Sequence, residues 1–346
     1  MAIVEKRALI LREACALDSA FKRFLRRFNP KEHRRTSEKI FVAAFGKHPG
    51  WDDHIDDIGL ETDALIKAKR TLYIQGISGN VDSGSWDKLA SDQRIEAFNR
   101  VIFWYIDGHF IVGRMWSSRD GKGRKSYPFV VCVQCWKLPI QWIFDRVLPQ
   151  LEKVERTCTA ATSANDVRMS IQSTRQELRQ SAQQCESPPN SILVYPDALS
   201  RLAGRPELGP DREGLFRILY HIHREVGRLT PGTAKGKVSG SALLRLPAGP
   251  NTVQEDVLLW SSFLLARFGM TTSILILVPP IDKWIDVIVG QPTELQLYCL
   301  RASPKVIPLT SNIPYNIDPE FIAHANTLIQ GRHSPMLGPG TKSPPT

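Results

Sequence analysis

The apolar residues of this chain recur at two spacings, and each spacing predicts a different kind of element. Short, strongly apolar runs predict strands at residues 40–45, 100–106, 109–116 and 127–136. Asp107-Gly108, between the second and third runs, is typical of a two-residue hairpin turn. Steps of three and four predict helices at residues 61–74 and 139–151. The first half therefore predicts a small, mainly antiparallel sheet with helices packed on it.

The second half repeats this order of elements. A helix at 211–226 precedes a predicted strand at 242–246, a helix at 253–268, strands at 273–278, 284–289 and 295–300, and a last helix at 319–328. We expect an α/β (α+β) protein with a second α/β unit of similar element order. A diverged duplication is a hypothesis that rests on this order alone.

Changes in composition divide the chain into five segments. Residues 1–38 predict a basic amphipathic helix and a linker, and residues 39–157 a first α/β domain. Residues 158–190 predict a polar helical connector, since Ser187-Pro188-Pro189-Asn190 breaks the chain after it. Residues 191–330 predict the second α/β domain, and the Gly-, Pro- and Ser-rich residues 331–346 a disordered tail.

The positive charge of the chain is concentrated at one end. Of a net charge of +10, residues 1–39 supply +6, from 11 Lys or Arg and 5 Asp or Glu. This disfavours nucleic-acid binding by the whole fold. It leaves open, as a second alternative function, a binder of nucleic acid or of an acidic membrane surface through residues 1–38. The chain has no run of apolar residues long enough to span a membrane, and no signal peptide pattern. Six scattered cysteines are not a secreted disulfide scaffold. We therefore expect a cytoplasmic protein.

The densest polar segment, residues 46–57, follows the first predicted strand. Its Asp52, Asp53, His54 and Asp57 are residue types that ligate Zn²⁺, Mn²⁺ or Fe²⁺. A metal-dependent hydrolase is thus one alternative, although the spacing matches no known metal motif. The interpretation that we favour is a structural or protein-binding loop with no metal and no catalytic residue.

A second polar segment, residues 117–125, combines glycines with cations. Such a turn can bind a phosphate through backbone amides, but it is not a P-loop and it precedes a strand, which favours a hairpin turn with solvated charges. Cys132 and Cys135 form a lone CxxC in an extended run, where their side chains diverge, so core packing is expected. His221 and His223 lie two apart on a predicted helix and do not share a face.

These two polar segments together resemble the N-terminal domain of the TagF-like proteins, which are associated with type VI secretion. That family has a Gly-Lys-x-Pro-x-x-Gly-Asp loop after a strand, and Gly46, Lys47, Pro49 and Asp53 match it, with Asp52 in place of the glycine. It also has Ser-x-Asp-x-x-Gly-Arg followed by an aromatic residue and proline. The residues that match this second motif are Ser118, Asp120, Gly123, Arg124 and, after one inserted residue, Tyr127-Pro128.

The resemblance covers residues 39–157 and implies a longin-like or profilin-like sandwich without enzymatic activity or cofactor. It implies a regulator or adaptor that binds proteins, including a forkhead-associated-domain scaffold or another secretion-system component. No small-molecule substrate is evident. By analogy, we expect the two segments to meet at one side of the sheet, where Asp52, Asp53, Asp56 and Asp57 would face Arg119, Lys122, Arg124 and Lys125.

Overall fold

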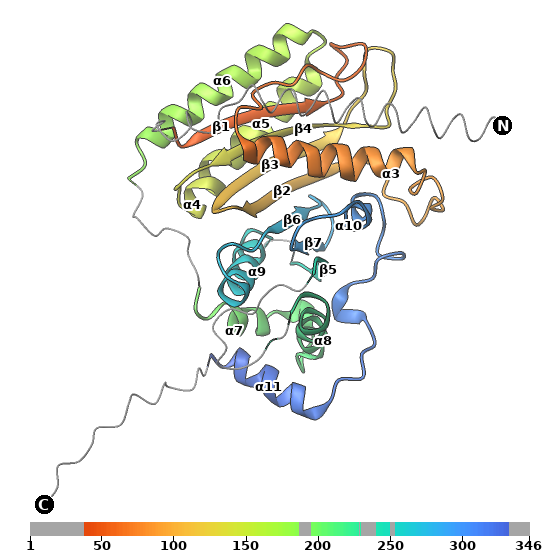
Figure 1. The fold of residues 1–346 in the computed structure, drawn as a ribbon, viewed down its shortest axis with the longest axis vertical. Coiled ribbons are helices and arrows are strands. Elements are labelled where there is room, and N and C mark those ends of the chain that lie inside the picture. Colours follow the sequence, from red (N-terminus) through yellow and green to blue (C-terminus); the bar gives the residue numbers. More distant parts are fainter. Residues whose placement is uncertain (1–37, 187–194, 228, 230–239, 250–252, 332–346) are drawn as a thin grey trace, which may run out of the picture. The chain divides into compact units, whose positions relative to one another are not determined.

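The structure is a computed structural model that describes residues 38–186, 195–227, 229, 240–249 and 253–331 (Figure 1). The chain divides into two compact units, Met1–Glu38 and Lys39–Thr346. The described helices and strands all belong to the second unit. The predicted N-terminal helix, the Gly-, Thr- and Lys-rich loop before residue 240 and the predicted tail lie almost entirely outside the described residues.

Seven strands form one antiparallel sheet in the order β1-β4-β3-β2-β6-β7-β5. The strands are β1 (Ile40–Gly46), β2 (Asn99–Ile106), β3 (His109–Ser117), β4 (Pro128–Cys135), β5 (Ala242–Pro247), β6 (Ile274–Val278) and β7 (Trp284–Val289). Almost every residue of the central strands is buried, because helices or loops cover both faces. The predicted mixed α/β class, with an antiparallel sheet flanked by helices, is confirmed.

The hairpin of β2 and β3 forms where the sequence predicts it. Asp107 and Gly108 have φ angles of 50° and 79°, which are the two positive values that a tight type I′ turn requires. Ile106 and His109 face each other across this turn.

The two halves of the chain share the sheet. Strand β2 pairs with β6 from Val101↔Val278 to Tyr105↔Ile274. Trp104 Nε1 also donates to Ser273 Oγ at 2.8 Å, and both groups are buried. Residues 39–157 and 191–330 therefore contribute strands to a single sheet.

A long helical segment follows β1. It begins with α2 (Asp63–Ala68), which Thr62 caps by accepting a hydrogen bond from Leu65 N. It continues through a π-helical stretch (Lys69–Ser78) and ends with α3 (Gly79–Asp82). The helix that was expected at 61–74 is therefore present and extends further.

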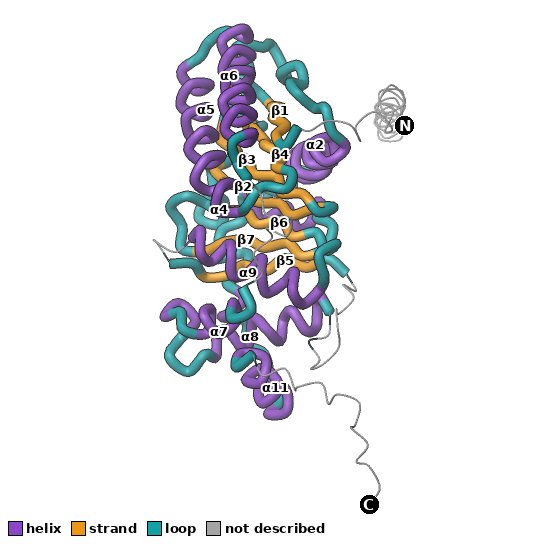
Figure 2. Tube along the Cα trace, turned by 90° about the vertical axis from the view of Figure 1, so that its left-hand side faces the viewer, coloured by secondary structure: helices purple, strands orange, loops and turns teal. Residues whose placement is uncertain are grey.

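The helices after β4 are α4 (Ile140–Trp142), a π-helical turn (Ile143–Val147), α5 (Leu148–Ala160) and α6 (Ala164–Gln183). Figure 2 shows α5 and α6 side by side. Helix α6 was expected to be a polar connector, but it buries Val167, Ile171 and Leu178. Its Arg175 and Arg179 donate to backbone oxygens of β1. The polar face of α6 is thus part of the packing around β1.

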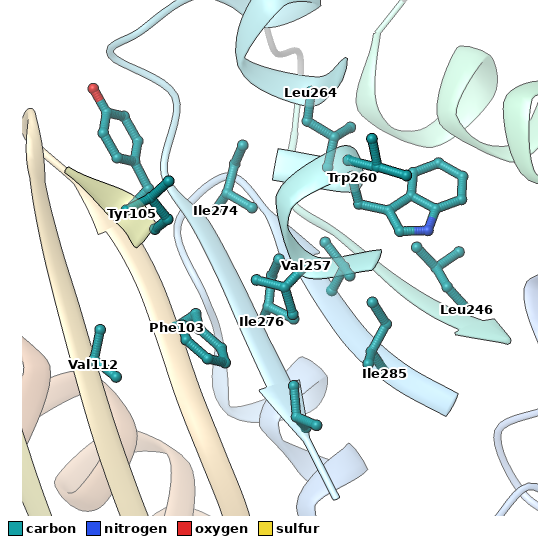
Figure 3. Close-up of a cluster of buried hydrophobic side chains, with 14 of the residues drawn as sticks. Phe103, Tyr105, Val112, Leu246, Val257, Trp260, Leu264, Ile274, Ile276 and Ile285 are labelled. Carbon is teal, nitrogen blue, oxygen red and sulfur yellow. The ribbon is translucent and has the colours of Figure 1, made fainter. Parts of the chain in front are cut away.

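The helices of the second half are α7 (Ala198–Ala203), α8 (Glu213–His221), α9 (Val253–Phe268), α10 (Glu294–Leu297) and α11 (Pro319–Ile329). Figure 3 shows Val257, Trp260 and Leu264 of α9 beside β5, β6 and β7. Phe103 and Tyr105 of β2 belong to the same cluster of buried residues. One apolar core therefore continues past the β2–β6 pair.

The strand predicted at 295–300 is wrong, because these residues form α10 and a 3₁₀ turn (Tyr298–Leu300). Thr293 and Gln296 form a capping box, in which Gln296 Oε1 accepts from Thr293 N at 3.0 Å. The second half thus supplies three strands to the sheet, where four were predicted. In each half the first strand pairs with the last, β1 with β4 and β5 with β7. The diverged duplication therefore stays a hypothesis.

Candidate functional site

The two polar segments singled out in the sequence lie against each other. Residues 46–57 follow β1 and residues 117–125 join β3 to β4; we call them the paired loops. They meet because β1 and β3 both pair with β4 and both end at its first residues. Lys47 N donates to Pro128 O at 3.1 Å, and Gly121 N donates to Trp51 O at 2.6 Å.

Gly46 makes this close approach of β1 and β4 possible. Its φ of +120° is one that residues with a side chain rarely adopt. A Cβ atom at this position would lie 2.3 Å from Pro128 O. Gly46 therefore has a structural role at the base of the paired loops, where the backbone oxygen of Pro128 packs against it.

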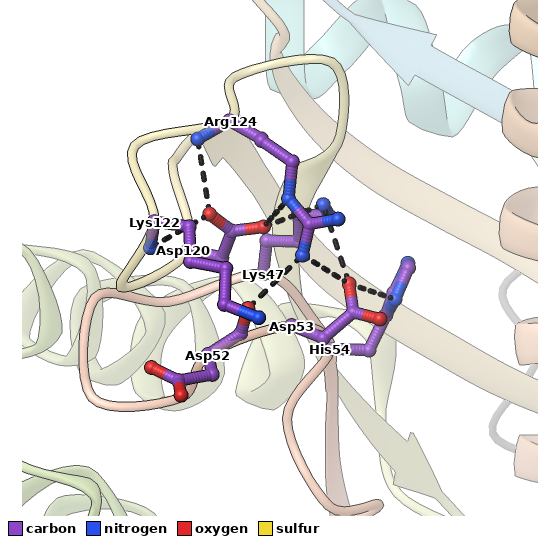
Figure 4. Close-up of polar contacts among 7 residues, drawn as sticks. All are labelled: Lys47, Asp52, Asp53, His54, Asp120, Lys122 and Arg124. Atoms are coloured by element: carbon purple, nitrogen blue, oxygen red, sulfur yellow. Dashed lines mark hydrogen bonds and ion pairs between the residues drawn. The ribbon is translucent and has the colours of Figure 1, made fainter.

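Asp120 is the centre of the contact between the loops (Figure 4). Its carboxylate is buried, and Oδ2 accepts from Lys47 Nζ at 2.7 Å and from Arg124 Nε at 2.6 Å. Oδ1 accepts from the backbone amides of Lys122 and Arg124. Burial raises the pKa of Asp120, but the hydrogen bonds from Lys47 and Arg124 lower it more, so this pKa lies well below its ordinary value.

Next to this buried contact, Arg124 and Asp53 form an exposed ion pair. Arg124 Nη2 donates to Asp53 Oδ1 and to the backbone oxygen of Asp52, each at 3.0 Å. Lys47 Nζ and His54 Nδ1 lie 3.5 and 3.2 Å from the same Asp53 oxygen. Burial lowers the pKa of His54 more than the charge of Asp53 raises it. The exposed layer is thus fixed to the buried one through Lys47 and Arg124.

The predicted pairing of four aspartates with four cations is correct only for Asp53 and Arg124. Asp56 accepts from Trp51 Nε1 at 3.2 Å and pairs with Arg168 of α6 at 2.5 Å. Asp57 pairs with Lys69. The Asp52 carboxylate is drawn without a contact to the other residues of Figure 4. Within the described ranges, no group of three or more His, Cys, Asp or Glu residues is arranged to hold a metal ion.

Ser118 and Pro49 lie apart from the ion pairs, in the wall of a cleft of about 670 Å³. His48 lines the same cleft; its Nε2 donates to Cys158 O at 2.8 Å and its Nδ1 accepts from Gly50 N at 3.0 Å. Burial lowers the pKa of His48, although the hydrogen bond to Cys158 opposes this. The paired loops therefore present two different surfaces. One is the exposed Asp53–Arg124 ion pair, which we call the crest, and the other is one wall of the cleft.

Three further charged residues of this cleft belong to no motif that the sequence shows. Arg94, Glu96 and Arg301 line it, and Arg301 comes from the second half of the chain. Glu96 accepts from Arg94 Nε at 2.9 Å and from Arg301 Nη2 at 3.3 Å. These residues are distant in the sequence, and they come together because the β2–β6 pairing places the two halves of the chain in one sheet. No local sequence pattern could therefore identify them.

The other candidates are packing residues. Cys132 and Cys135 are both buried, and burial raises the pKa of the Cys132 thiol to about 12. His221 Nδ1 lies 2.6 Å from the hydroxyl of Tyr315, whereas His223 Nδ1 accepts from Leu229 N. The cysteine pair therefore packs in the core as expected, and the two histidines have separate partners.

No helix in the described part of the chain is long and apolar enough to cross a membrane. No protein-family model matches the sequence, and a search of curated proteins found no match. Among solved structures, the chain is similar to the crystal structure of PA0076 from Pseudomonas aeruginosa PAO1, with 16% sequence identity and a TM-score of 0.26. The match covers 43% of this chain and 64%, less than two thirds, of that one.

Proposed function

We propose that this protein is a non-catalytic adaptor or regulator of a bacterial type VI secretion system, and that it binds its protein partner in the cytoplasm through the crest of the paired loops. The observation that carries the proposal is the buried Lys47–Asp120 ion pair beneath the exposed Asp53–Arg124 pair. The resemblance of both loops to the TagF-like motifs supports the same conclusion.

A fixed crest suits recognition of another protein. Arg124 is held by three separate acceptors, Asp120, Asp53 and the backbone of Asp52. Because these contacts already order the side chain, a partner would lose little conformational entropy on binding it. Charged groups of both signs are exposed there, which suits a partner surface of complementary charge. By the family resemblance, that partner is a forkhead-associated-domain scaffold or another secretion-system component.

The test is affinity capture of the full chain from its own cells, with the recovered proteins identified by mass spectrometry. Asp53→Ala and Arg124→Ala are compared with the wild type and with two control variants, Glu207→Ala and Arg146→Ala. Both control residues are exposed and lie outside the paired loops. We expect the wild type and controls to recover a secretion-system component. We expect the two crest variants to bind it about tenfold or more weakly.

Two outcomes would contradict the proposal in different ways. If no variant recovers a secretion-system component, the assignment to type VI secretion is wrong. If all variants recover it equally, the protein is an adaptor that uses another surface. Thermal unfolding of each variant establishes that the crest substitutions leave the fold intact.

A further inference from the structure

The cleft beside the paired loops has a strongly cationic lining. Four cationic side chains line it, Arg94, Arg119, Lys125 and Arg301, together with a single carboxylate, Glu96. They come from three stretches of chain that are distant in sequence, which the shared sheet brings to one place. We propose that this cleft binds a small phosphorylated molecule, with Arg119 and Lys125 as its principal contacts.

Arg119 and Lys125 are available for a ligand. Both are exposed, and within the described residues neither side chain makes a hydrogen bond or ion pair. Lys122, in the same turn, is also exposed but does not line the cleft. The turn thus directs two of its cations into the cleft lining and leaves the third outside it.

The other two arginines of the lining, Arg94 and Arg301, are held in position. Glu96 contacts both Arg94 and Arg301, and Arg301 also donates to the backbone oxygens of Ile95 and Glu96. Burial and the positive charge of Arg94 lower the pKa of Arg301. Arg94 also forms an ion pair with Asp87 at 3.6 Å, so these two arginines have carboxylate partners. The excess positive charge of the lining therefore comes from Arg119 and Lys125, and a bound anion would neutralise it.

The remaining lining favours a phosphate over a simple carboxylate. Ser117, Ser118, Ser126 and Thr159 place hydroxyl groups at the cleft. Ser117 Oγ already accepts from Phe98 N, so its proton can be donated to a ligand. A phosphate group has about two negative charges and three acceptor oxygens, which match several cations and hydroxyl donors. Trp116 and Pro49 supply an apolar wall, and a volume of about 670 Å³ exceeds that of a phosphate alone.

The proposal is independent of the proposed function, because it concerns the cleft and not the crest. It is tested by isothermal titration of the full chain at constant ionic strength. The probes are sodium pyrophosphate, ADP, and citrate as a polycarboxylate of similar charge. We expect saturable binding of pyrophosphate and ADP, and weaker binding of citrate.

The variants decide whether the binding is in the cleft. We expect Arg119→Ala and Lys125→Ala each to weaken pyrophosphate binding about tenfold, the effect of losing one charge-assisted hydrogen bond. Lys122→Ala removes the same charge from the same turn and is expected to bind like the wild type. Among the residues that the structure describes, these three side chains make no hydrogen bond or ion pair, so their loss should not affect folding, which thermal unfolding will check.

Three results would overturn the proposal. The first is the absence of saturable binding of pyrophosphate and ADP. The second is binding of citrate as tight as that of pyrophosphate, which would indicate a general anion site. The third is equal binding by Arg119→Ala, Lys125→Ala and Lys122→Ala, which would place the anion elsewhere, for example on the basic residues 1–39.

Discussion

Lys47 Nζ lies 2.7 Å from Asp120 Oδ2, and both side chains are almost completely buried. Lys305 and Asp92 form an ion pair of the same length, but on the surface. A buried pair is screened little by water, and removal of one partner leaves an uncompensated charge, whereas an exposed pair contributes little. We therefore expect the Lys47–Asp120 contact to hold the paired loops together more strongly than an exposed ion pair would.

We expect a double-mutant cycle to show this difference. Lys47→Met and Asp120→Ala, singly and together, should give a coupling free energy severalfold larger than that of Lys305→Met and Asp92→Ala. Urea unfolding gives both values under the same conditions. Equal coupling in the two cycles would mean that the buried pair does not hold the loops together.

Substitution of Asp286 should strongly destabilise the second half of the sheet. Arg245 of β5 and Asp286 of β7 face each other in register, with both side chains fully buried and two hydrogen bonds between them. Asp286→Ala leaves the guanidinium buried without a counter-charge, so we expect a loss of about 3–5 kcal/mol in the free energy of unfolding. Asp211→Ala, at an exposed position, is the control, and a similar loss there would contradict this reasoning.

Gly46→Ala should destabilise the protein more than Gly123→Ala. Both glycines have positive φ, with values of 120° and 81°. A Cβ at Gly46 would clash with Pro128 O, whereas nothing lies within 4 Å of one at Gly123. Each variant should lose about 1–3 kcal/mol from backbone strain, and Gly46→Ala more because of the clash. Chemical denaturation measures both, and equal losses would rule out a contribution from the clash.

The protein should lose stability as the pH falls below neutral. The folded-state pKa of His48 is lowered by burial, and its Nδ1 already accepts from Gly50 N, so the folded state disfavours a second proton. The unfolded chain therefore binds more protons. The stabilisation is fully present above the unfolded pKa near 6.5 and is lost as the pH falls from there to the folded pKa.

This loss is at most about 1.4 kcal/mol per pH unit for one histidine. Urea unfolding at pH 7.5 and 5.5 measures it, and His48→Gln should reduce the difference between the two pH values. His54, His109 and His221 also have lowered pKa values, chiefly from burial, so part of the difference should remain. An unchanged difference in His48→Gln would exclude His48 as a source.

The local elements of this fold could be predicted from sequence because their signals are local. Asp107-Gly108 specifies a turn by its backbone preferences, and the helix Val253–Phe268 has the predicted bounds. The β2–β6 pairing could not be predicted, since many apolar strands can pair with one another and no local feature selects the partner. The strand predicted at 295–300 was wrong because Thr293 and Gln296, which form a capping box, start a helix there.

The candidate site was predicted in part for the same reason. Motif positions identified the two loops, and the analogy with the TagF-like proteins predicted that they meet, with opposite charges facing each other. The burial of Asp120 was not foreseen, because an aspartate in a turn rich in charge and glycine is usually solvated. The cleft was missed because Arg94 and Arg301 lie 207 residues apart in the numbering and are brought together only by the shared sheet.

The pairing of β2 with β6 has a consequence for any shortened form of this protein. A gene product that stops near residue 190 would leave β2 with one row of unsatisfied backbone amides and carbonyls beside apolar side chains. Such a strand invites association with other copies. Truncation between the halves should therefore give insoluble material, and co-production of both fragments should restore solubility by strand complementation.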